Sequence, residues 1–270
     1  MNLSITPYLR CAILALMALP ILLNGQTGER EEADTVRIIP DLVYARNIDE
    51  TGKKKDLFVD VYLPATPPPA DGYPVAVWFH GGGYSIGDRK SFSDVSEEFA
   101  KAGWCSLQVS YRLRKDPDSS FMAMFGDVME DADAVRIWIV KNSKKYKIDT
   151  GRTVFGGESA GAEIAYMAGI KTNHPPAGRV TIKGIIDLYG GYIGFLSITS
   201  VPPPLFICHG TADPWVPFTD AAKIQSAFSN AGGRTELFVM ESGGHNFRDG
   251  RFKQAVMEKI LGFAAQAAGK

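Results

Sequence analysis

TVFGGESAGAEIA, residues 153–165, joins a strand pattern to a helix pattern through a single serine. Thr153–Phe155 is β-branched and aromatic, which is typical of a strand, and the small residues from Ala160 onward allow a helix to pack closely on a sheet. Between them, Gly157–Gly161 matches the pattern G-x-S-x-G, in which a strained turn from strand to helix exposes the serine. The pattern makes Ser159 the candidate nucleophile.

A second match to the same pattern shows that the surrounding sequence must decide. Gly83–Gly87 reads GYSIG, but the charged residues Asp88–Lys90 follow it, which is typical of a solvated loop. Ser159 instead lies between a strand pattern and a helix pattern. We interpret Ser85 as a loop residue at the rim of the site and keep it as the second candidate nucleophile.

Short apolar runs alternate with helical patterns along the rest of the chain. The predicted strands are Thr35–Ile39, Leu57–Leu63, Val75–Phe79, Cys105–Ser110, Thr153–Phe155, Ile182–Leu188, Pro204–Cys208 and Glu236–Val239. The predicted helices are Ser91–Lys101, Gly126–Asn142, Ala160–Ile170, Asp220–Ala231 and Arg251–Ala267. This alternation indicates an α/β fold in which helices cover both faces of a parallel sheet.

The glycine run His80–Gly83 directly follows the predicted strand Val75–Phe79. Consecutive glycines can point backbone N–H groups into a site, because no side chain stands in the way. Two such donors, with the N–H of the residue after the nucleophile, would stabilise a negatively charged oxygen. We interpret the run as an oxyanion loop, and the alternative is a flexible glycine loop.

A serine nucleophile needs a general base, and the base needs an acid that orients it. His245 is the candidate base, because it lies among glycines just after the predicted strand Glu236–Val239. We interpret His80 and His209 as residues that hold turns, and His174 as a surface residue.

Asp213 is the candidate orienting acid, with Asp187 and Glu241 as the alternatives. Asp187 lies within an apolar run, and Glu241 lies close beside the base. Ser159, Asp213 and His245 each come just beyond a predicted strand. Since ligands of open α/β sheets bind at the carboxyl ends of the strands, the three side chains are expected to meet there.

Composition bounds the remaining possibilities. The chain has 270 residues and is 45% hydrophobic, so it can bury a sizeable core. Its 29 basic and 30 acidic residues give a net charge of −1, so the chain has no excess positive charge to attract nucleic acid. The three cysteines and four histidines do not show metal-ligand spacing, so we expect no metal site.

Residues 1–26 are predicted to be a signal peptide. Arg10 precedes the apolar run Cys11–Leu23, whose 13 residues are too few for a membrane span of about 20. We therefore expect export to the periplasm or the exterior, no stable membrane insertion, and a single domain at residues 27–270. The alternative is an N-terminal tail that is not removed.

The motifs taken together resemble those of the α/β-hydrolase superfamily. The resemblance is strongest to its secreted esterase branch, near hormone-sensitive-lipase-like enzymes and bacterial feruloyl or acetyl xylan esterases. It rests on HGGGYSIGDR from His80, VSYRL from Val109, GESAGA from Gly157, HGTADPWVP from His209 and GGHNF from Gly243, and it covers nearly everything after residue 26. It implies a three-layer fold with an eight-stranded, mostly parallel sheet, in which the strands that carry Cys105 and Cys208 are not neighbours.

The resemblance also implies site residues and a reaction. Ser159 would be the nucleophile, His245 the base and Asp213 its partner. The backbone N–H groups of Gly82, Gly83 and Ala160 would form the oxyanion hole. The implied activity is hydrolysis of carboxylic esters with no cofactor.

The chain departs from the hormone-sensitive-lipase pattern at two places. Glu158 replaces the Asp that usually precedes the nucleophile, and only residues 189–203 fill the interval where those enzymes carry a helical cap. We therefore expect little or no cap and an open site, suited to short-chain or bulky-alcohol esters such as acetyl or feruloyl esters of plant polysaccharide. The aromatic residues expected to contact substrate, or else to pack at the rim, are Tyr84, Tyr192, Trp215 and Phe247.

Two other functions stay open at the level of sequence. The same fold and triad serve amide hydrolases of the exopeptidase or arylformamidase type. A non-catalytic binding module could also retain the fold. The sequence does not indicate an oligomeric state.

Overall fold

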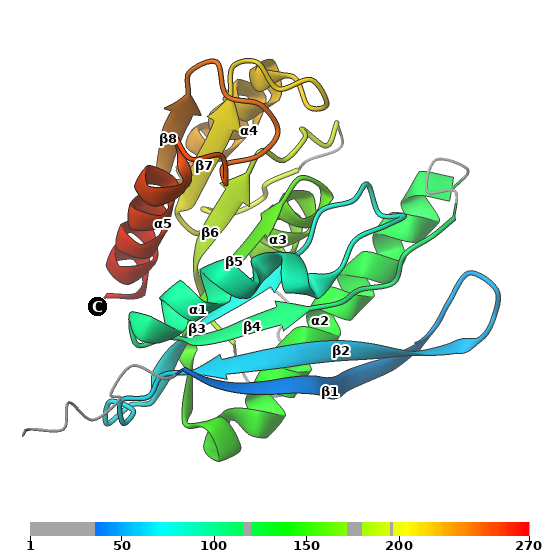
Figure 1. Ribbon diagram of the computed structural model, residues 1–270. Coiled ribbons are helices and arrows are strands. Elements are labelled where there is room, and N and C mark those ends of the chain that lie inside the picture. The colour runs from blue at the N-terminus through cyan, green and yellow to red at the C-terminus, as the bar shows by residue number, and fades with distance from the viewer. Residues whose placement is uncertain (1–35, 116–119, 172–179, 195–196, 270) are drawn as a thin grey trace, which may run out of the picture. The chain divides into compact units, whose positions relative to one another are not determined.

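The alternation of strands and helices expected from the sequence is present in the structure, a computed structural model that describes residues 36–115, 120–171, 180–194 and 197–269 (Figure 1). The strands are β1 Arg37–Ile48, β2 Lys54–Leu63, β3 Tyr73–Phe79, β4 Cys105–Val109, β5 Ile148–Glu158, β6 Ile182–Leu188, β7 Leu205–Gly210 and β8 Thr235–Met240. The helices are η1 Arg89–Phe92, α1 Ser93–Lys101, α2 Phe121–Tyr146, α3 Ala160–Ile170, α4 Phe218–Asn230 and α5 Lys253–Ala268.

All eight strands form one sheet in the order β1-β2-β4-β3-β5-β6-β7-β8. The first two pairings, β1 with β2 and β2 with β4, are antiparallel, and every other pairing is parallel. The predicted eight-stranded, mostly parallel sheet is therefore confirmed. Cys105 on β4 and Cys208 on β7 are separated by three strands, and both are free and buried.

Alternate residues of the central strands face two separate cores. Val75 and Val77 of β3 pack with the apolar faces of α2, α3 and α4, whereas Ala76 and Trp78 pack with those of α1 and α5. Because side chains alternate across a strand, a strand that is apolar throughout must be covered on both sides. The described unit thus has three layers, with helices on both faces of the sheet (Figure 1).

Three elements extend far beyond their predicted bounds: β1, α2 and β5, which runs from Ile148 to Glu158 instead of Thr153–Phe155. Strand β1 continues past Pro40 to Ile48, because the register shifts between Ile39 and Leu42, and Asp41 has φ 57°. A proline is tolerated at such a bulge on an edge strand, so Pro40 does not end the strand. Helix α2 runs from Phe121 to Tyr146. The residue after it, Lys147, caps the helix with left-handed backbone angles, although it is not a glycine.

Residues Ala33–Lys270 form one unit of structure. The predicted signal peptide, residues 1–26, and His174 lie outside the described residues, so the boundary at residue 27 remains a prediction. Within the described ranges, no helix is both long and apolar enough to cross a membrane.

Candidate active site

Ser159 occupies the turn between the end of β5 at Glu158 and the start of α3 at Ala160. Its backbone has φ 53° and ψ −125°, a conformation that is costly for a residue with a Cβ atom. The Ser159 N–H donates to the carbonyl of Leu188 on β6 at 2.9 Å, which helps to hold the turn. The strained serine turn predicted from G-x-S-x-G is therefore present.

The glycines on either side of Ser159 leave room for this turn. A Cβ on Gly157 would lie 2.2 Å from the carbonyl oxygen of Gly161, and a Cβ on Gly161 would lie 2.0 Å from that of Phe79. Neither position can accept a side chain unless the backbone moves. The two glycines thus let α3 start directly against β3 and β5.

His245 and Asp213 are brought together from the loops that follow β8 and β7. The Nδ1 atom of His245 lies 2.6 Å from Oδ2 of Asp213, whose side chain is fully buried. The other carboxylate oxygen of Asp213 accepts the N–H groups of Trp215 at 2.8 Å and Val216 at 2.9 Å. This arrangement fixes the orientation of the imidazole ring.

The environment of Asp213 favours its ionised form. Burial raises its pKa, but the hydrogen bonds from the Val216 N–H, from His245 and from the Trp215 N–H more than offset that effect, and the pKa lies below its ordinary value. An ionised Asp213 accepts a hydrogen bond from the N–H group at Nδ1 of His245, so Nε2 is the nitrogen available as a base.

One pocket of about 960 Å³ collects most of the residues predicted from the sequence. Ser159, His245, Gly82, Gly83 and Ala160 all line it. The pocket lies where the parallel strands β3, β5, β7 and β8 end, which is the edge expected for ligand binding in an open α/β sheet.

The glycine loop after β3 passes close to Ser159. A Cβ on Gly81 would lie 3.3 Å from the Cβ of Ser159. The next residues, Gly82, Gly83 and Tyr84, all have positive φ values of 116°, 56° and 61°. Ala160 is the first residue of α3, and the first N–H groups of a helix have no carbonyl partner within it. The glycine loop and the start of α3 therefore both lie next to Ser159.

The four predicted aromatic contacts divide into two groups. Tyr84 and Trp215 line the pocket, and the Trp215 residue is 79% exposed. Phe247 is fully buried in the core beside α5, because the ring turns inward and the neighbouring residue Arg248 lines the pocket instead. Tyr192 lines a separate hollow against α4, where Lys223 lies over its ring. The structure therefore places Tyr84 and Trp215 at the pocket and Phe247 and Tyr192 away from it.

The two remaining described histidines hold turns. His80 stacks on Tyr111 with ring centroids 4.3 Å apart, and its Nδ1 lies 2.7 Å from the carbonyl oxygen of Gly81. His209 Nε2 lies 3.0 Å from the carbonyl oxygen of Val216. Burial lowers the pKa of both rings, which favours their neutral form.

The alternative nucleophile Ser85 and the alternative acid Asp187 occupy other roles, and the second alternative acid, Glu241, is exposed. The Ser85 hydroxyl lies 3.4 Å from the carbonyl oxygen of Gly82, within its own loop. Asp187 is fully buried at the end of β6 and accepts the Gly190 N–H at 2.7 Å, and burial raises its pKa to about 7. The partner of His245 is thus Asp213 and not Asp187.

Several residues around the pocket were not identified from the sequence. The Tyr189 ring lies 4.7 Å from the His245 ring, and its hydroxyl donates to Glu158 at 2.9 Å. Arg248 also donates to Glu158, at 2.8 Å. Glu163 lies one helical turn after Ser159 on α3 and lines the pocket. That i, i+4 spacing is the one signal in the sequence that could have indicated Glu163.

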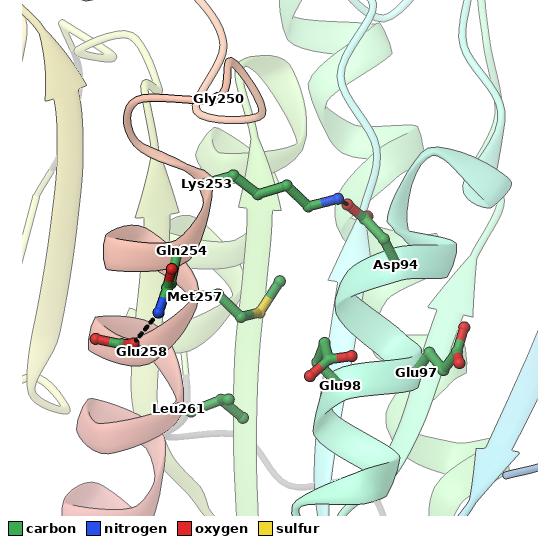
Figure 2. Close-up of a pocket in the computed structure, with 9 residues that line it drawn as sticks. All are labelled: Asp94, Glu97, Glu98, Gly250, Lys253, Gln254, Met257, Glu258 and Leu261. Atoms are coloured by element: carbon green, nitrogen blue, oxygen red, sulfur yellow. Dashed lines mark hydrogen bonds and ion pairs between the residues drawn. The ribbon is translucent and has the colours of Figure 1, made fainter. Parts of the chain in front are cut away.

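A second hollow, of about 540 Å³, lies between α1 and α5. Figure 2 shows Lys253 reaching across it to Asp94, an ion pair of 3.0 Å, and Gln254 bonded to Glu258 on α5. Its lining holds no serine, cysteine or histidine, so it offers no serine or cysteine nucleophile. Across the described residues, no group of three or more His, Cys, Asp or Glu side chains could hold a metal ion.

Two protein families match the chain in succession. The BD-FAE family matches residues 59–192, and the prolyl oligopeptidase family matches residues 192–270. Esterase LipI of Mycobacterium tuberculosis is 32% identical over 105 residues, which cover 39% of this chain and 31% of that protein. Carboxylesterase NlhH of the same species is 29% identical over 144 residues, which cover 53% of this chain and 44% of that protein. The chain spans about a third to a half of the length of these relatives.

Solved structures of an esterase from Thermogutta terrifontis have the same fold. The propionate-bound form has a TM-score of 0.69 and 24% identity, and the match covers 87% of this chain and 94% of that one. The form phosphorylated by paraoxon has a TM-score of 0.70 and 23% identity, and the match covers 87% of this chain and 95% of that one.

Proposed function

Because the chain belongs to the esterase branch of the α/β-hydrolase superfamily, we propose that it is a serine carboxylic-ester hydrolase. The observation that carries the proposal is the 2.6 Å contact between His245 Nδ1 and the buried Asp213, in a pocket that His245 and Ser159 line together. The strained backbone of Ser159 adds support, because such turns expose a nucleophile at the edge of a sheet.

The proposed reaction is acyl transfer in two steps. His245 takes the proton of the Ser159 hydroxyl, whose oxygen forms a bond to the ester carbonyl carbon. The N–H groups of Gly82, Gly83 and Ala160 stabilise the negative charge on the carbonyl oxygen. His245 then protonates the departing alcohol, and water attacks the acyl-serine in the same way to release the acid.

The proposed substrates have short acyl groups or bulky alcohols, such as acetyl or feruloyl esters of plant polysaccharide. Two exposed apolar side chains in the pocket lining support a bulky alcohol group: Trp215 is 79% exposed and Ile86 is 69% exposed. The flat ring of Trp215 can stack on a sugar or a phenol. Residues 189–194 and 197–203 contain no helix that could cover the pocket. The T. terrifontis esterase is known with propionate and with butyrate bound, which supports a short acyl group.

The test is a chain-length series of p-nitrophenyl esters, from acetate to palmitate, with the Ser159→Ala variant alongside. We expect the rate to be highest for the short chains and to fall by a factor of about 10³ or more in the variant. Paraoxon should phosphorylate the wild type at Ser159 and leave the variant unmodified, which mass spectrometry can measure. Activity that persists in Ser159→Ala would point to Ser85, and a maximum at palmitate would contradict the open site.

A second candidate function is amide hydrolysis on the same residues. It is favoured by the match of residues 192–270, which include Asp213 and His245, to the prolyl oligopeptidase family. Paired p-nitrophenyl ester and p-nitroanilide substrates with the same acyl group separate the two functions. A non-catalytic binding module is the third possibility, and a folded wild type that is inert towards both substrates and paraoxon would support it.

We also propose that the protein is exported and that residues 1–26 are removed. The support is the short apolar run Cys11–Leu23 after Arg10. Expression of the full chain, followed by cell fractionation and N-terminal sequencing, tests this. Recovery from the cytoplasm with Met1 retained would contradict it.

A further inference from the structure

Glu163 connects three segments around the pocket. Its Oε2 accepts the hydroxyl of Tyr84 at 2.5 Å, and its Oε1 accepts the N–H of Gly191 at 3.2 Å. Its own N–H donates to the carbonyl of Ser159 at 3.2 Å, within the first turn of α3. The carboxylate therefore links the glycine loop and the segment after β6 to the helix that begins next to the nucleophile.

Tyr84 needs such a link because of its backbone. It has φ 61° and directly follows Gly82 and Gly83, which also have positive φ values. Glycine adopts this conformation readily, but a residue with a Cβ atom does not. Tyr84 is held by its buried ring, by its bond to Glu163, and by the Arg114 N–H, which donates to its carbonyl at 2.9 Å.

We propose that Glu163 is a positioning residue which, through the Tyr84 hydroxyl, holds the N–H groups of Gly82 and Gly83 in place beside Ser159. The inference rests on the proposed ester hydrolysis, because it assigns those N–H groups to the oxyanion. Stabilisation of an oxyanion depends on donors that are already in place before charge develops. Loss of the Tyr84–Glu163 bond should therefore lower kcat more than it changes KM.

The electrostatic surroundings make this link sensitive to pH. Burial raises the pKa of Glu163 to about 7, with a further increase from Asp220 on α4, although the bonds from Tyr84 and Gly191 favour the ionised form. Burial also raises the pKa of Tyr84 far above its ordinary value, so its hydroxyl remains the donor. The other titratable groups that interact with Glu163 are the buried Tyr111, Tyr166 and Asp187. The bond should weaken as Glu163 becomes protonated below about pH 7.

The test uses the variants Tyr84→Phe, Glu163→Gln and the double variant, with p-nitrophenyl acetate as substrate. We expect each single variant to lower kcat about tenfold, less than the 10² to 10³ of losing an oxyanion donor directly, with KM changed less than about threefold. The double variant should be no slower than the slower single variant, since both act on the same bond: Tyr84→Phe removes its donor, and Glu163→Gln replaces its charged acceptor with a weaker, neutral amide oxygen. Protonation of the catalytic base lowers kcat at acid pH in every variant, but the loss below about pH 7 should be smaller in Glu163→Gln than in the wild type, because the amide does not titrate.

Tyr44→Phe is the matched control for loss of a tyrosine hydroxyl. Tyr44 lies on β1, and its hydroxyl donates to the Ser110 carbonyl at 2.6 Å, away from the pocket-lining residues. It should keep the wild-type kcat, and its thermal midpoint shows how much of any loss reflects stability alone. Multiplying effects in the double variant, an unchanged kcat in Tyr84→Phe, or an unchanged pH profile in Glu163→Gln would each overturn the proposal.

The rate of Ser159 labelling by a fluorophosphonate separates this inference from the proposed function. If the wild type is labelled but hydrolyses no ester, the proposed function is wrong, and the labelling rates of the same variants then test the positioning role. If the wild type is not labelled, Ser159 is not a nucleophile and the inference is overturned with it.

Discussion

At the scale of single residues, the contacts of Asp213 identify it as the acid that orients His245. Its carboxylate accepts two backbone N–H groups as well as the His245 ring, and its pKa lies below the ordinary value. Asp213→Asn leaves the shape unchanged, but its one accepting oxygen stays with the backbone N–H groups of Trp215 and Val216, so the amide NH₂ faces Nδ1 of His245 and favours the wrong tautomer. We expect kcat on p-nitrophenyl acetate to fall by a factor of about 10³ to 10⁴.

Asp187→Asn is the matched control for this prediction. Asp187 was one of the two alternative acids from the sequence, but it lies within β6 and its Oδ1 accepts the Gly190 N–H. We expect that variant to keep kcat within about threefold of the wild type. A collapse of kcat in Asp187→Asn with activity retained in Asp213→Asn would reverse the assignment of the acid.

The sequence identified the serine, histidine and acid because each stands just beyond a strand pattern, among residues suited to tight turns. It could not determine which way a loop side chain turns. Phe247 was expected at the pocket, yet the ring is buried and the neighbouring Arg248 lines the pocket. Which of the two side chains turns inward depends on the space available beside α5, and a local sequence pattern carries no information about that space.

At the scale of elements, the contact between α3 and β3 depends on Gly161. A Cβ at this position would lie 2.0 Å from the Phe79 carbonyl oxygen, so Gly161→Ala must push the start of α3 away from β3. We expect the free energy of unfolding to fall by about 2 to 4 kcal/mol and the proposed ester hydrolysis to be lost, since the Ser159 turn moves with the helix. Urea unfolding and kcat measure the two effects.

Gly126 in α2 provides the matched control for the same substitution. It is exposed within the helix, and nothing lies within 4 Å of a Cβ built there. Gly126→Ala should therefore raise stability by roughly 0.5 to 1 kcal/mol and leave kcat unchanged. If Gly161→Ala behaved like Gly126→Ala, the close approach of α3 to β3 would be refuted.

The bounds of the elements show where sequence patterns stop being informative. Strand β1 was expected to end before Pro40, but a bulge carries the edge strand on to Ile48. Helix α2 ends at Lys147, a left-handed residue with no glycine to mark it. Helix α3 has the predicted bounds, Ala160–Ile170, whereas the central strand β5 begins at Ile148, five residues before its predicted start at Thr153.

At the scale of the whole molecule, the alternation of strands and helices indicated the fold class, but the strand order came from resemblance to a known family. The observed order places β4 between β2 and β3, which no local pattern in this chain specifies. The fold then brings together residues from loops after β3, β5, β7 and β8. Those loops meet only because the parallel strands end at one edge.

The buried carboxyl groups make the stability of the whole molecule depend on pH. Burial raises the pKa of Asp187 to about 7, so the folded state binds a proton that the unfolded chain has released. By linkage, the free energy of unfolding then falls as the pH rises from about 4 to about 7. The shift from 3.8 to about 7 corresponds to an upper limit of roughly 4 kcal/mol. Glu163 acts in the same direction, whereas the buried His80 and His209, whose pKa values are lowered, act in the opposite one.

The contribution of Asp187 is isolated by comparing the wild type with Asp187→Asn in urea unfolding at pH 5 and pH 8. The amide in this variant cannot titrate, and its carbonyl can still accept the Gly190 N–H, so the variant should lose less stability than the wild type over this interval. Asp94→Asn is the control. Burial raises the pKa of Asp94, but Arg248 and Lys253 hold it below its ordinary value, so its contribution is complete above about pH 5 and should leave the difference unchanged. Equal losses in the wild type and Asp187→Asn would mean that Asp187 is ionised throughout, in spite of its burial.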